Sequence, residues 1–486
     1  RSLWTFYPDD LEYGLRLATD LAEAGRGAES LAVVADLRKL PPPDGDDPRI
    51  DLAEANAARR LADLATQKRA AEAAEAKGRE SGEDLVVAQA LLLQGEVLIR
   101  RGTPQPAVAL FEQASDRFEQ AGDRMGVVRA LTLVGVALRE QGELKGAEAH
   151  YRQALAMAQT LGSQSGVALQ ASNLGVIYLQ RGDLRQARES LERGRSLCAK
   201  LGDRVLEARA LNALGTVLWA QGELAEARNA FEEALEMSRA TGNRRDEARA
   251  MQSLGTALAR QGRLAEGRRL QERAFALFSR TGDSSSAAAA LADSAEVLIR
   301  QGAFPAANQR LEEALAAKRN AGDRIGTAEV LDSKAALAYA AGDVQTAGRL
   351  NEEMLASARS LGSRALEVSG LLRQGLLRRT AGDLEGAGRS LDAALRVSEE
   401  MGAALQSSEV RLELASLALA RQRFAEAERL SRQTAEWYAS RYLPESEAQA
   451  WELLAQALAR QERAKEAREA TARALSARQG LDASNR

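Results

Sequence analysis

The sequence predicts an all-α solenoid built from about twelve helix hairpins. The first observation is a glycine series with a step of 40 residues, which falls at positions 82, 122, 162, 202, 242, 282, 322, 362 and 402. A second series is offset by 20 residues and falls at positions 102, 142, 182, 222, 262, 302, 342 and 382. The composition agrees, because the 486 residues are 45% hydrophobic but only 4% aromatic, which suits helices packed through Ala and Leu.

These glycines are typical of helix ends. In Gly202-Asp203 and Gly222-Glu223 the glycine suits the left-handed residue that follows a helix, and the acidic residue suits the start of the next helix. Between the turns, apolar residues recur at spacings of three and four, as in Leu211, Leu214, Leu218 and then Ala227, Phe231, Ala234, Leu235. That spacing indicates helices rather than strands. Each 40-residue unit is therefore expected to hold two helices.

A third glycine series lies in the middle of the first helix, where Gly costs about 1 kcal/mol relative to Ala. It runs through Gly95, Gly135, Gly175, Gly215 and Gly255, passes through Ala295 and Ala335, and resumes at Gly375. Alanines stand at the matching place on the second helix, at positions 147, 187, 227, 307, 347, 387, 427 and 467. We expect small residues to face small residues there, so that the two helices approach closely.

The repeat resembles the tetratricopeptide repeat (TPR). The resemblance rests on Asn212-Ala-Leu-Gly215-Thr-Val-Leu218, followed by Gly222-Glu-Leu-Ala-Glu-Ala227, Phe231 and Ala234. Tyr151 also fills the aromatic position of the motif, which Leu191, Leu311 and Leu391 take in other repeats, and the late Pro of the family is missing. The resemblance implies a right-handed superhelix whose first helices line a concave face.

The repeats are not uniform along the chain. We expect a divergent TPR-like hairpin over residues 1–40, a Pro-rich bend over 41–48, a degenerate repeat over 49–81, ten 40-residue repeats over 82–480 and a frayed tail over 481–486. The bend contains Pro41-Pro42-Pro43, and Pro48 suits the first position of the following helix.

Composition excludes several classes of function. Lys plus Arg (66) nearly balances Asp plus Glu (69), so there is no basic excess of the kind that binds nucleic acid. One cysteine, Cys198, and one histidine, His150, cannot form a disulfide or a His/Cys metal site. No apolar run is long enough to span a membrane and no signal peptide is evident. We expect no enzyme activity, cofactor or metal, and a cytoplasmic location, with an exported sensor half as the alternative.

The first helices supply the candidate binding residues. In one repeat Arg209, Asn212, Thr216 and Trp219 share a stripe, because they are spaced by three and four. Guanidinium groups bind carboxylates and a carboxamide pairs with a peptide unit, which suits an extended peptide. The expected peptide-binding residues are Arg129, Asn173, Arg209, Asn212, Thr216, Trp219, Arg249 and Gln252. The competing interpretation of the stripe is a solvated face without a ligand. For Trp219 the competing interpretation is packing.

The same stripe turns acidic in later repeats, where it carries Glu296, Glu329, Asp332, Tyr339, Glu409 and Glu452. The expected groove is therefore basic and rich in amides in its first half and acidic in its second.

Three hypotheses for function follow. The first is a non-enzymatic interaction scaffold or sensor that binds a protein or peptide segment in the concave groove. The second rests on residues 7–17, 38–43 and 47–54, which resemble the C-terminal TPR half of bacterial regulators that begin with a Ser/Thr kinase or winged-helix domain. The third is self-assembly through the terminal repeats, where Trp437, Tyr438, Tyr442 and Trp451 gather; capping of the last repeat is the competing interpretation.

Overall fold

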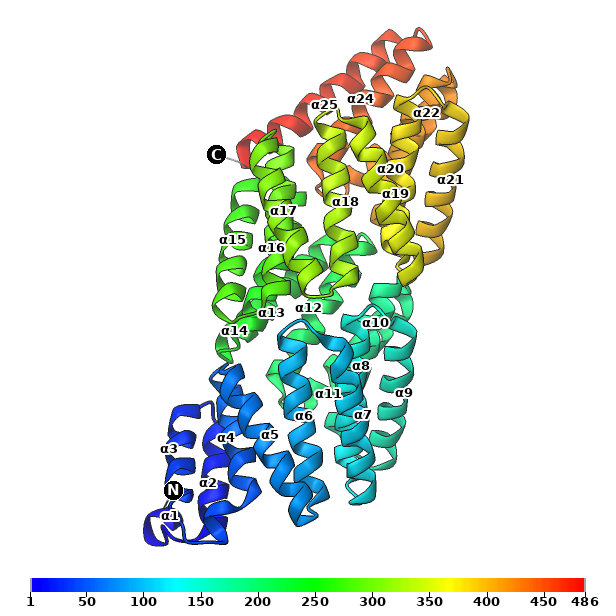
Figure 1. Cartoon of the computed structure of the whole chain (residues 1–486). Helices are drawn as coiled ribbons and strands as arrows, with labels where there is room; N and C mark the ends of the chain where they lie inside the picture. Colours follow the sequence, from blue (N-terminus) through cyan, green and yellow to red (C-terminus); the bar gives the residue numbers. More distant parts are fainter. Residues whose placement is uncertain (1, 485–486) are drawn as a thin grey trace. The chain divides into compact units, whose positions relative to one another are not determined.

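The computed structural model describes residues 2–484, and Figure 1 shows them as a succession of helices. No strand occurs within that range, which confirms the all-α prediction. The chain divides into two compact units, residues 1–170 and 171–486, and the boundary falls within α10 (Gln164–Arg181). Each unit is a stack of antiparallel helix pairs, as expected of a TPR solenoid.

The first unit begins with short helices and continues with the regular repeats. Its helices are α1 (Ser2–Phe6), α2 (Leu11–Glu23), α3 (Gly27–Leu37), α4 (Pro48–Arg60), α5 (Leu64–Ser81), α6 (Asp84–Arg100), α7 (Pro104–Gln120), α8 (Arg124–Glu140) and α9 (Leu144–Thr160). Between α3 and α4 lie a cis Pro42–Pro43 bond and the short 3-10 helix η1 (Asp44–Asp46). Pro48 takes the first position of α4, as predicted.

The second unit repeats the same hairpin to the end of the chain. Its helices are α11 (Leu184–Leu201), α12 (Arg204–Ala220), α13 (Leu224–Ala240), α14 (Arg244–Arg260), α15 (Leu264–Arg280), α16 (Ser284–Arg300), α17 (Phe304–Asn320), α18 (Arg324–Ala340), α19 (Val344–Leu361), α20 (Arg364–Thr380), α21 (Leu384–Met401), α22 (Ala404–Ala420), α23 (Phe424–Ala439), α24 (Pro444–Arg460) and α25 (Ala464–Ser484). The last helix therefore continues beyond position 481, where we expected a frayed tail; residues 485 and 486 lie outside the described residues.

The turns between helices use the left-handed conformation that the glycines predict. Gly202 and Gly222, for example, have φ of 71° and 80°. Among residues 2–484, four turns adopt this conformation without glycine, at Ala62, Gln422, Tyr442 and Glu462.

The mid-helix glycines lie close to the small residues of the second helix, as at Gly255 and Gly267, where a Cβ atom on Gly255 would lie 2.9 Å from the Gly267 carbonyl oxygen. In most repeats they also make room for a large side chain, which the sequence pattern did not indicate. A Cβ atom on Gly135 would lie 2.5 Å from the ring of Tyr151, and one on Gly215 would lie 2.6 Å from the ring of Phe231. The alanine of the second helix contributes its backbone, since the Ala227 carbonyl oxygen would lie 3.2 Å from the same Gly215 position. The glycine and the aromatic residue are thus two halves of one contact.

The first helices of the second unit form the inner layer of its stack. Each of α12, α14, α16, α18, α20 and α22 contacts the next first helix in addition to its own partner helix. In a curved stack the layer whose members touch across repeats is the concave one. The inner faces of these helices are therefore the surface that the sequence analysis assigned to binding.

The second unit also closes on itself. Helix α12 contacts α22, although the two are far apart in the order of the elements. Arg441 Nε donates to the carbonyl oxygen of Gly222 over 3.1 Å, and a Cβ atom at Gly222 would lie 2.8 Å from the ring of Trp437. The start and the end of this unit are therefore in direct contact.

Candidate functional site

The sequence-predicted residues fall in both units. Arg129 lies on α8 in the first unit and is exposed, whereas the other seven lie in the second unit. Asn173, on α10, is half-buried. The remaining six lie on α12 and α14, two first helices that contact each other, so the structure does bring them together.

The two arginines of this group share one carboxylate. Arg209 Nε lies 2.6 Å from Asp246 Oδ2, and Arg249 Nη1 lies 3.6 Å from Asp246 Oδ1. Asp246 is 5% exposed, so its buried carboxylate has a fixed position, while the Arg209 side chain is more exposed. The basic half of the predicted groove is therefore partly neutralised within the protein.

The central residues of the α12 stripe differ in their accessibility. Asn212 is 8% exposed, and its Oδ1 accepts no hydrogen bond from the described residues. Thr216, one turn later, is exposed, and its hydroxyl donates to the Asn212 carbonyl oxygen over 3.3 Å. Trp219 is partly buried against the core cluster that contains Leu224, Leu405 and Tyr438. For Trp219 the structure therefore favours packing.

Gln252 connects the amide-rich half of the inner face to the acidic half. Its Nε2 donates to Asp293 Oδ2 over 2.8 Å, and the hydroxyl of Thr256 donates to the same oxygen over 3.3 Å. Thr256 is itself the acceptor for Gln271 Nε2 at 3.4 Å. This chain of donors fixes the orientation of the Asp293 carboxylate on α16.

Five carboxylates of α16, α18 and α22 interact electrostatically on the inner face. We call them the inner carboxylate cluster: Asp293, Glu296, Glu329, Asp332 and Glu409. Burial, assisted by the charge of Glu296, raises the pKa of Asp293 to about 6. Burial also raises the pKa of Glu409, against the lowering effect of Arg260. The cluster therefore holds more negative charge than its surroundings readily solvate.

Within the cluster, the carboxylate of Glu329 has neither a paired cation nor a hydrogen-bond donor from residues 2–484. Loss of bulk water among the surrounding helices raises the pKa of its carboxyl to about 7, with Lys318 opposing the shift and nearby aspartates adding to it. The side chain nevertheless keeps solvent-accessible surface. No ion pair or side-chain hydrogen bond joins its carboxylate to a described residue. An accessible carboxylate without a cation is a natural contact point for a ligand.

Sequence reasoning found part of this cluster. It identified Glu296, Glu329, Asp332 and Glu409, but it also placed Tyr339 and Glu452 in the groove. Tyr339 lies 3.2 Å from the Thr380 hydroxyl on the next first helix, and Glu452 pairs with Arg478 at 2.5 Å, so neither belongs to the inner carboxylate cluster. Asp293 was missed, although it precedes Glu296 by three positions and therefore shares its helix face.

The C-terminal aromatic residues serve mainly in packing. Tyr438 and Trp451 are 1% and 4% exposed within one core cluster, and Trp437 stacks against the Arg441 guanidinium at 4.3 Å. Tyr442 alone of the four is exposed, at 81%. The hydroxyl of Tyr438 is buried and has no hydrogen-bond partner among the described residues.

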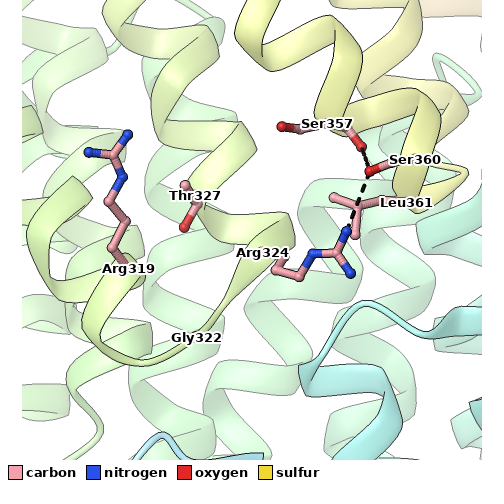
Figure 2. A pocket seen from close by; sticks show the side chains of 7 residues that line it. All are labelled: Arg319, Gly322, Arg324, Thr327, Ser357, Ser360 and Leu361. Atoms are coloured by element: carbon pink, nitrogen blue, oxygen red, sulfur yellow. Dashed lines mark hydrogen bonds between the residues drawn. The ribbon is translucent and has the colours of Figure 1, made fainter.

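A small surface pocket lies at the turn between α17 and α18, with a volume of about 250 Å³. Figure 2 shows Arg324 reaching from this turn toward Ser360, whose hydroxyl lies 3.5 Å away, while Arg319 stands on the other side of Thr327. Arg319 pairs with Glu353 at 3.3 Å. Because its lining arginines are engaged with neighbours, this pocket is a weaker candidate than the inner face.

Three further observations concern metal binding, the single cysteine and the membrane. Within the described residues no group of three or more His, Cys, Asp or Glu side chains is arranged to hold a metal ion. Cys198 is fully buried, and burial raises the pKa of its thiol to about 11, so it is protonated at neutral pH and inert as a nucleophile. No helix between residues 2 and 484 is both long and apolar enough to cross a lipid bilayer.

Comparisons with known proteins agree with this architecture. The MalT-like TPR region family matches residues 202–479, and the tetratricopeptide repeat family matches residues 86–160. No curated protein matches the sequence. Among solved structures, a Rap protein complexed with Competence and Sporulation Factor has a TM-score of 0.51 at 12% identity, over 82% of this chain and 99% of its own. The apo form of RapI has a TM-score of 0.47 at 15% identity, over 56% and 98%.

TPR arrays present an extended concave surface, and they typically serve as protein-interaction scaffolds rather than enzymes. The repeat period, the helix hairpins and the match over residues 202–479 lead to the same assignment: the chain belongs to the family of MalT-like TPR regions.

Proposed function

We propose that the chain is an interaction scaffold whose second unit binds an extended segment of a partner protein along the inner faces of α12, α14, α16 and α18. The observation that carries the proposal is the state of Asp293. Two donors hold one of its oxygens, and the other accepts no hydrogen bond from a described residue. A carboxylate that is oriented but only half used is suited to a ligand that brings donors of its own.

Neighbouring side chains on the same layer support the inner face as the binding surface. Asn212 makes no side-chain hydrogen bond with a described residue, and Thr216 beside it is exposed. A carboxamide both donates and accepts, so it matches the alternating N–H and C=O groups of an extended backbone. The Rap protein of the same fold was solved with Competence and Sporulation Factor bound, which supports a bound partner as the use of such an array.

The test is a random 15-residue peptide library displayed on phage and panned against the full chain. Recovered peptides are synthesised and titrated by isothermal calorimetry. Thr216→Trp places bulk on the inner face, and Glu236→Trp places the same bulk on an exposed site of the second helix α13. We expect Thr216→Trp and Asn212→Ala each to weaken binding at least tenfold, and Glu236→Trp to leave it unchanged.

Failure to recover any binding peptide overturns the proposal. So does equal affinity of the recovered peptides for wild type and Thr216→Trp, because the inner face would then not be the contact surface.

The regulatory hypothesis stays a second proposal, because it concerns what precedes Arg1 rather than the repeats themselves. It rests on the resemblance carried by residues 7–17, 38–43 and 47–54. Reading the coding sequence upstream of Arg1 tests it: a kinase or winged-helix domain supports it, and a start codon directly before Arg1 contradicts it.

A further inference from the structure

The inner carboxylate cluster has a surplus of negative charge. Arg260 lies 3.1 Å from both Glu296 and Glu409, and Arg373 lies 3.1 Å from Asp332. Lys318 also acts on the cluster, but its ammonium is paired with Asp323 at 2.6 Å. After these pairings no cation among the described residues is bound to Asp293 or Glu329.

The two carboxylates without a cation are also those that a ligand can reach. Both keep solvent-accessible surface, and they interact with each other across the contact of α16 with α18. Asp293 is fixed by Gln252 and Thr256, so its unused oxygen has a defined direction. The second oxygen of Asp293 is therefore an oriented hydrogen-bond acceptor without a donor among the described residues.

Tyr438 provides an independent sign of a missing group. Its side chain is 1% exposed, and its hydroxyl finds no hydrogen-bond partner among the described residues. Of the cluster, Glu409 acts electrostatically on that hydroxyl, as do Glu413 and Arg260, so the hydroxyl lies near the Glu409 end of the cluster. A buried hydroxyl without a partner costs free energy, so an unsatisfied polar group lies next to this end of the cluster.

We propose that the inner carboxylate cluster binds a cationic nitrogen, the ammonium of a lysine or the guanidinium of an arginine, carried by the partner segment. This inference rests on the proposed function and adds its chemistry. A guanidinium suits the site because it delivers several donors in one plane to more than one carboxylate. Binding would cancel charge that the surrounding protein solvates poorly.

A free polyamine offers the same cationic nitrogen. The protein segment is favoured because Asn212 and Thr216 lie on the same layer, on a first helix close to those that carry the cluster, where a backbone would pass. Spermidine, titrated alone, separates the two sources.

The experiment uses the same peptide library, panned in parallel against three proteins. They are the wild type, the double variant Asp293→Asn/Glu329→Gln, and a charge-matched control, Glu313→Gln/Glu352→Gln, which alters exposed carboxylates on the second helices α17 and α19. We expect Lys or Arg at one or two fixed positions in peptides from the wild type and the control, and no such preference with the double variant. Citrulline in place of a selected Arg should weaken binding to the wild type at least tenfold and to the double variant hardly at all.

A pH series adds a readout that a merely structural role would not move. Protonation of the cluster removes the charge that attracts the cation, so affinity should fall at least threefold between pH 8 and pH 5.5 for the wild type and stay flat for the double variant. Circular dichroism confirms that each variant is folded.

The outcomes separate the two proposals. Peptides that bind the inner face without any basic preference overturn the cation site and leave the proposed function standing. A basic preference that survives in the double variant places the cation elsewhere and also overturns it. Submillimolar binding of spermidine to the cluster without basic peptides identifies a polyamine and overturns the segment as the source. Recovery of no peptide at all removes the proposed function, and this inference falls with it.

Discussion

Arg260 Nη1 donates to Glu409 Oε1 over 3.1 Å, although 149 residues separate them along the chain. The same guanidinium lies 3.1 Å from Glu296 Oε1 through its Nε. One side chain of α14 thus joins α16, its neighbour in the stack, to α22, which lies near the other end of the second unit. A contact of this range is unusual for repeat arrays, whose contacts are mainly between adjacent repeats.

A double-mutant cycle on Arg260→Gln and Glu409→Gln should give a coupling of about 0.5–1 kcal/mol, because both side chains are partly exposed. Arg260→Gln should destabilise more than Glu409→Gln at pH 8, since it leaves two carboxylates facing each other. That difference should narrow at pH 5, where the raised pKa of Glu409 favours its protonation. Urea denaturation of the wild type, the two single variants and the double variant measures the free energies of unfolding that the cycle needs. A coupling near zero would mean that the two ends of the unit do not meet in solution.

Glu329→Gln should make the second unit more stable at neutral and alkaline pH. The carboxyl has a pKa of about 7 in the fold, above its ordinary value of 4.5, so its ionised form is penalised in the native state. The penalty is absent below about pH 4.5, grows as pH rises between these two values and is complete above about pH 7. Thermal unfolding across this range should show a higher Tm for the variant at pH 8, by about 1–3 °C, and equal Tm values at pH 4. A lower Tm at pH 8 contradicts the assignment.

Gly215→Ala should cost about 1–3 kcal/mol, because the new methyl group would meet the ring of Phe231 at 2.6 Å. Gly348→Ala is the matched control: a methyl group added to this helical glycine meets no atom within 4 Å, so the change should stabilise by about 0.5–1 kcal/mol. Combining Gly215→Ala with Phe231→Leu should recover part of the loss, since Ala295 and Leu311 occupy the same two positions in another repeat. Chemical denaturation checks each variant; a loss as large for Gly348→Ala would show that the aromatic contact is not the source of the cost.

Tyr438→Phe should leave the protein as stable as wild type or stabilise it by about 1 kcal/mol. The hydroxyl is buried without a partner among the described residues, so its removal relieves an uncompensated polar group while the ring remains packed. Trp451→Phe, also in the core cluster, changes buried volume and should be destabilising. A marked loss of stability in Tyr438→Phe would indicate that the hydroxyl has a partner in the native protein.

Cys198 should resist iodoacetamide in the native state at pH 7.5 and react once the chain is unfolded in urea. Its side chain is fully buried and the pKa of its thiol is raised to about 11. Mass spectrometry of the native and denatured samples measures the difference. Rapid modification of the native protein would show that α11 opens frequently.

The repeat architecture was predictable because its signals are local. A glycine at a helix end adopts positive φ, and Gly202 and Gly222 do so at the predicted positions. The close approach to the small residues of the second helix was predictable, but the large side chain beside the mid-helix glycine was not, because the pattern marks which positions are small and not which side chain fills the space. Gly135 and Tyr151 lie 16 positions apart, and only the crossing of the two helices shows that they meet.

The binding face was partly predictable. The stripe on α12 follows from helical spacing, but the pairing of Gln252 with Asp293 depends on the offset between neighbouring first helices. That offset is regular: Gln252 with Asp293, Asp332 with Arg373, and Tyr339 with Thr380 are each 41 positions apart. A repeat of 40 residues shifted by one would have placed Asp293 opposite Gln252 from the sequence alone. The contact of Arg260 with Glu409 has no such period, so nothing in the sequence marks it.

The contact of Trp437 and Arg441 with the turn at Gly222 changes the expected order in which the helices of this unit unfold. An open array of repeats loses its end repeats first, because each end has only one neighbour. Here Arg441 is bonded to a carbonyl 219 residues earlier, so the C-terminal hairpins brace helices at the start of the unit. The unfolding of the C-terminal helices is then coupled directly to that of the first helices of the unit, and not only through the repeats between them. Replacing Trp437 and Arg441 by alanine should therefore weaken hydrogen-exchange protection in α12 and α13 as well as in α23.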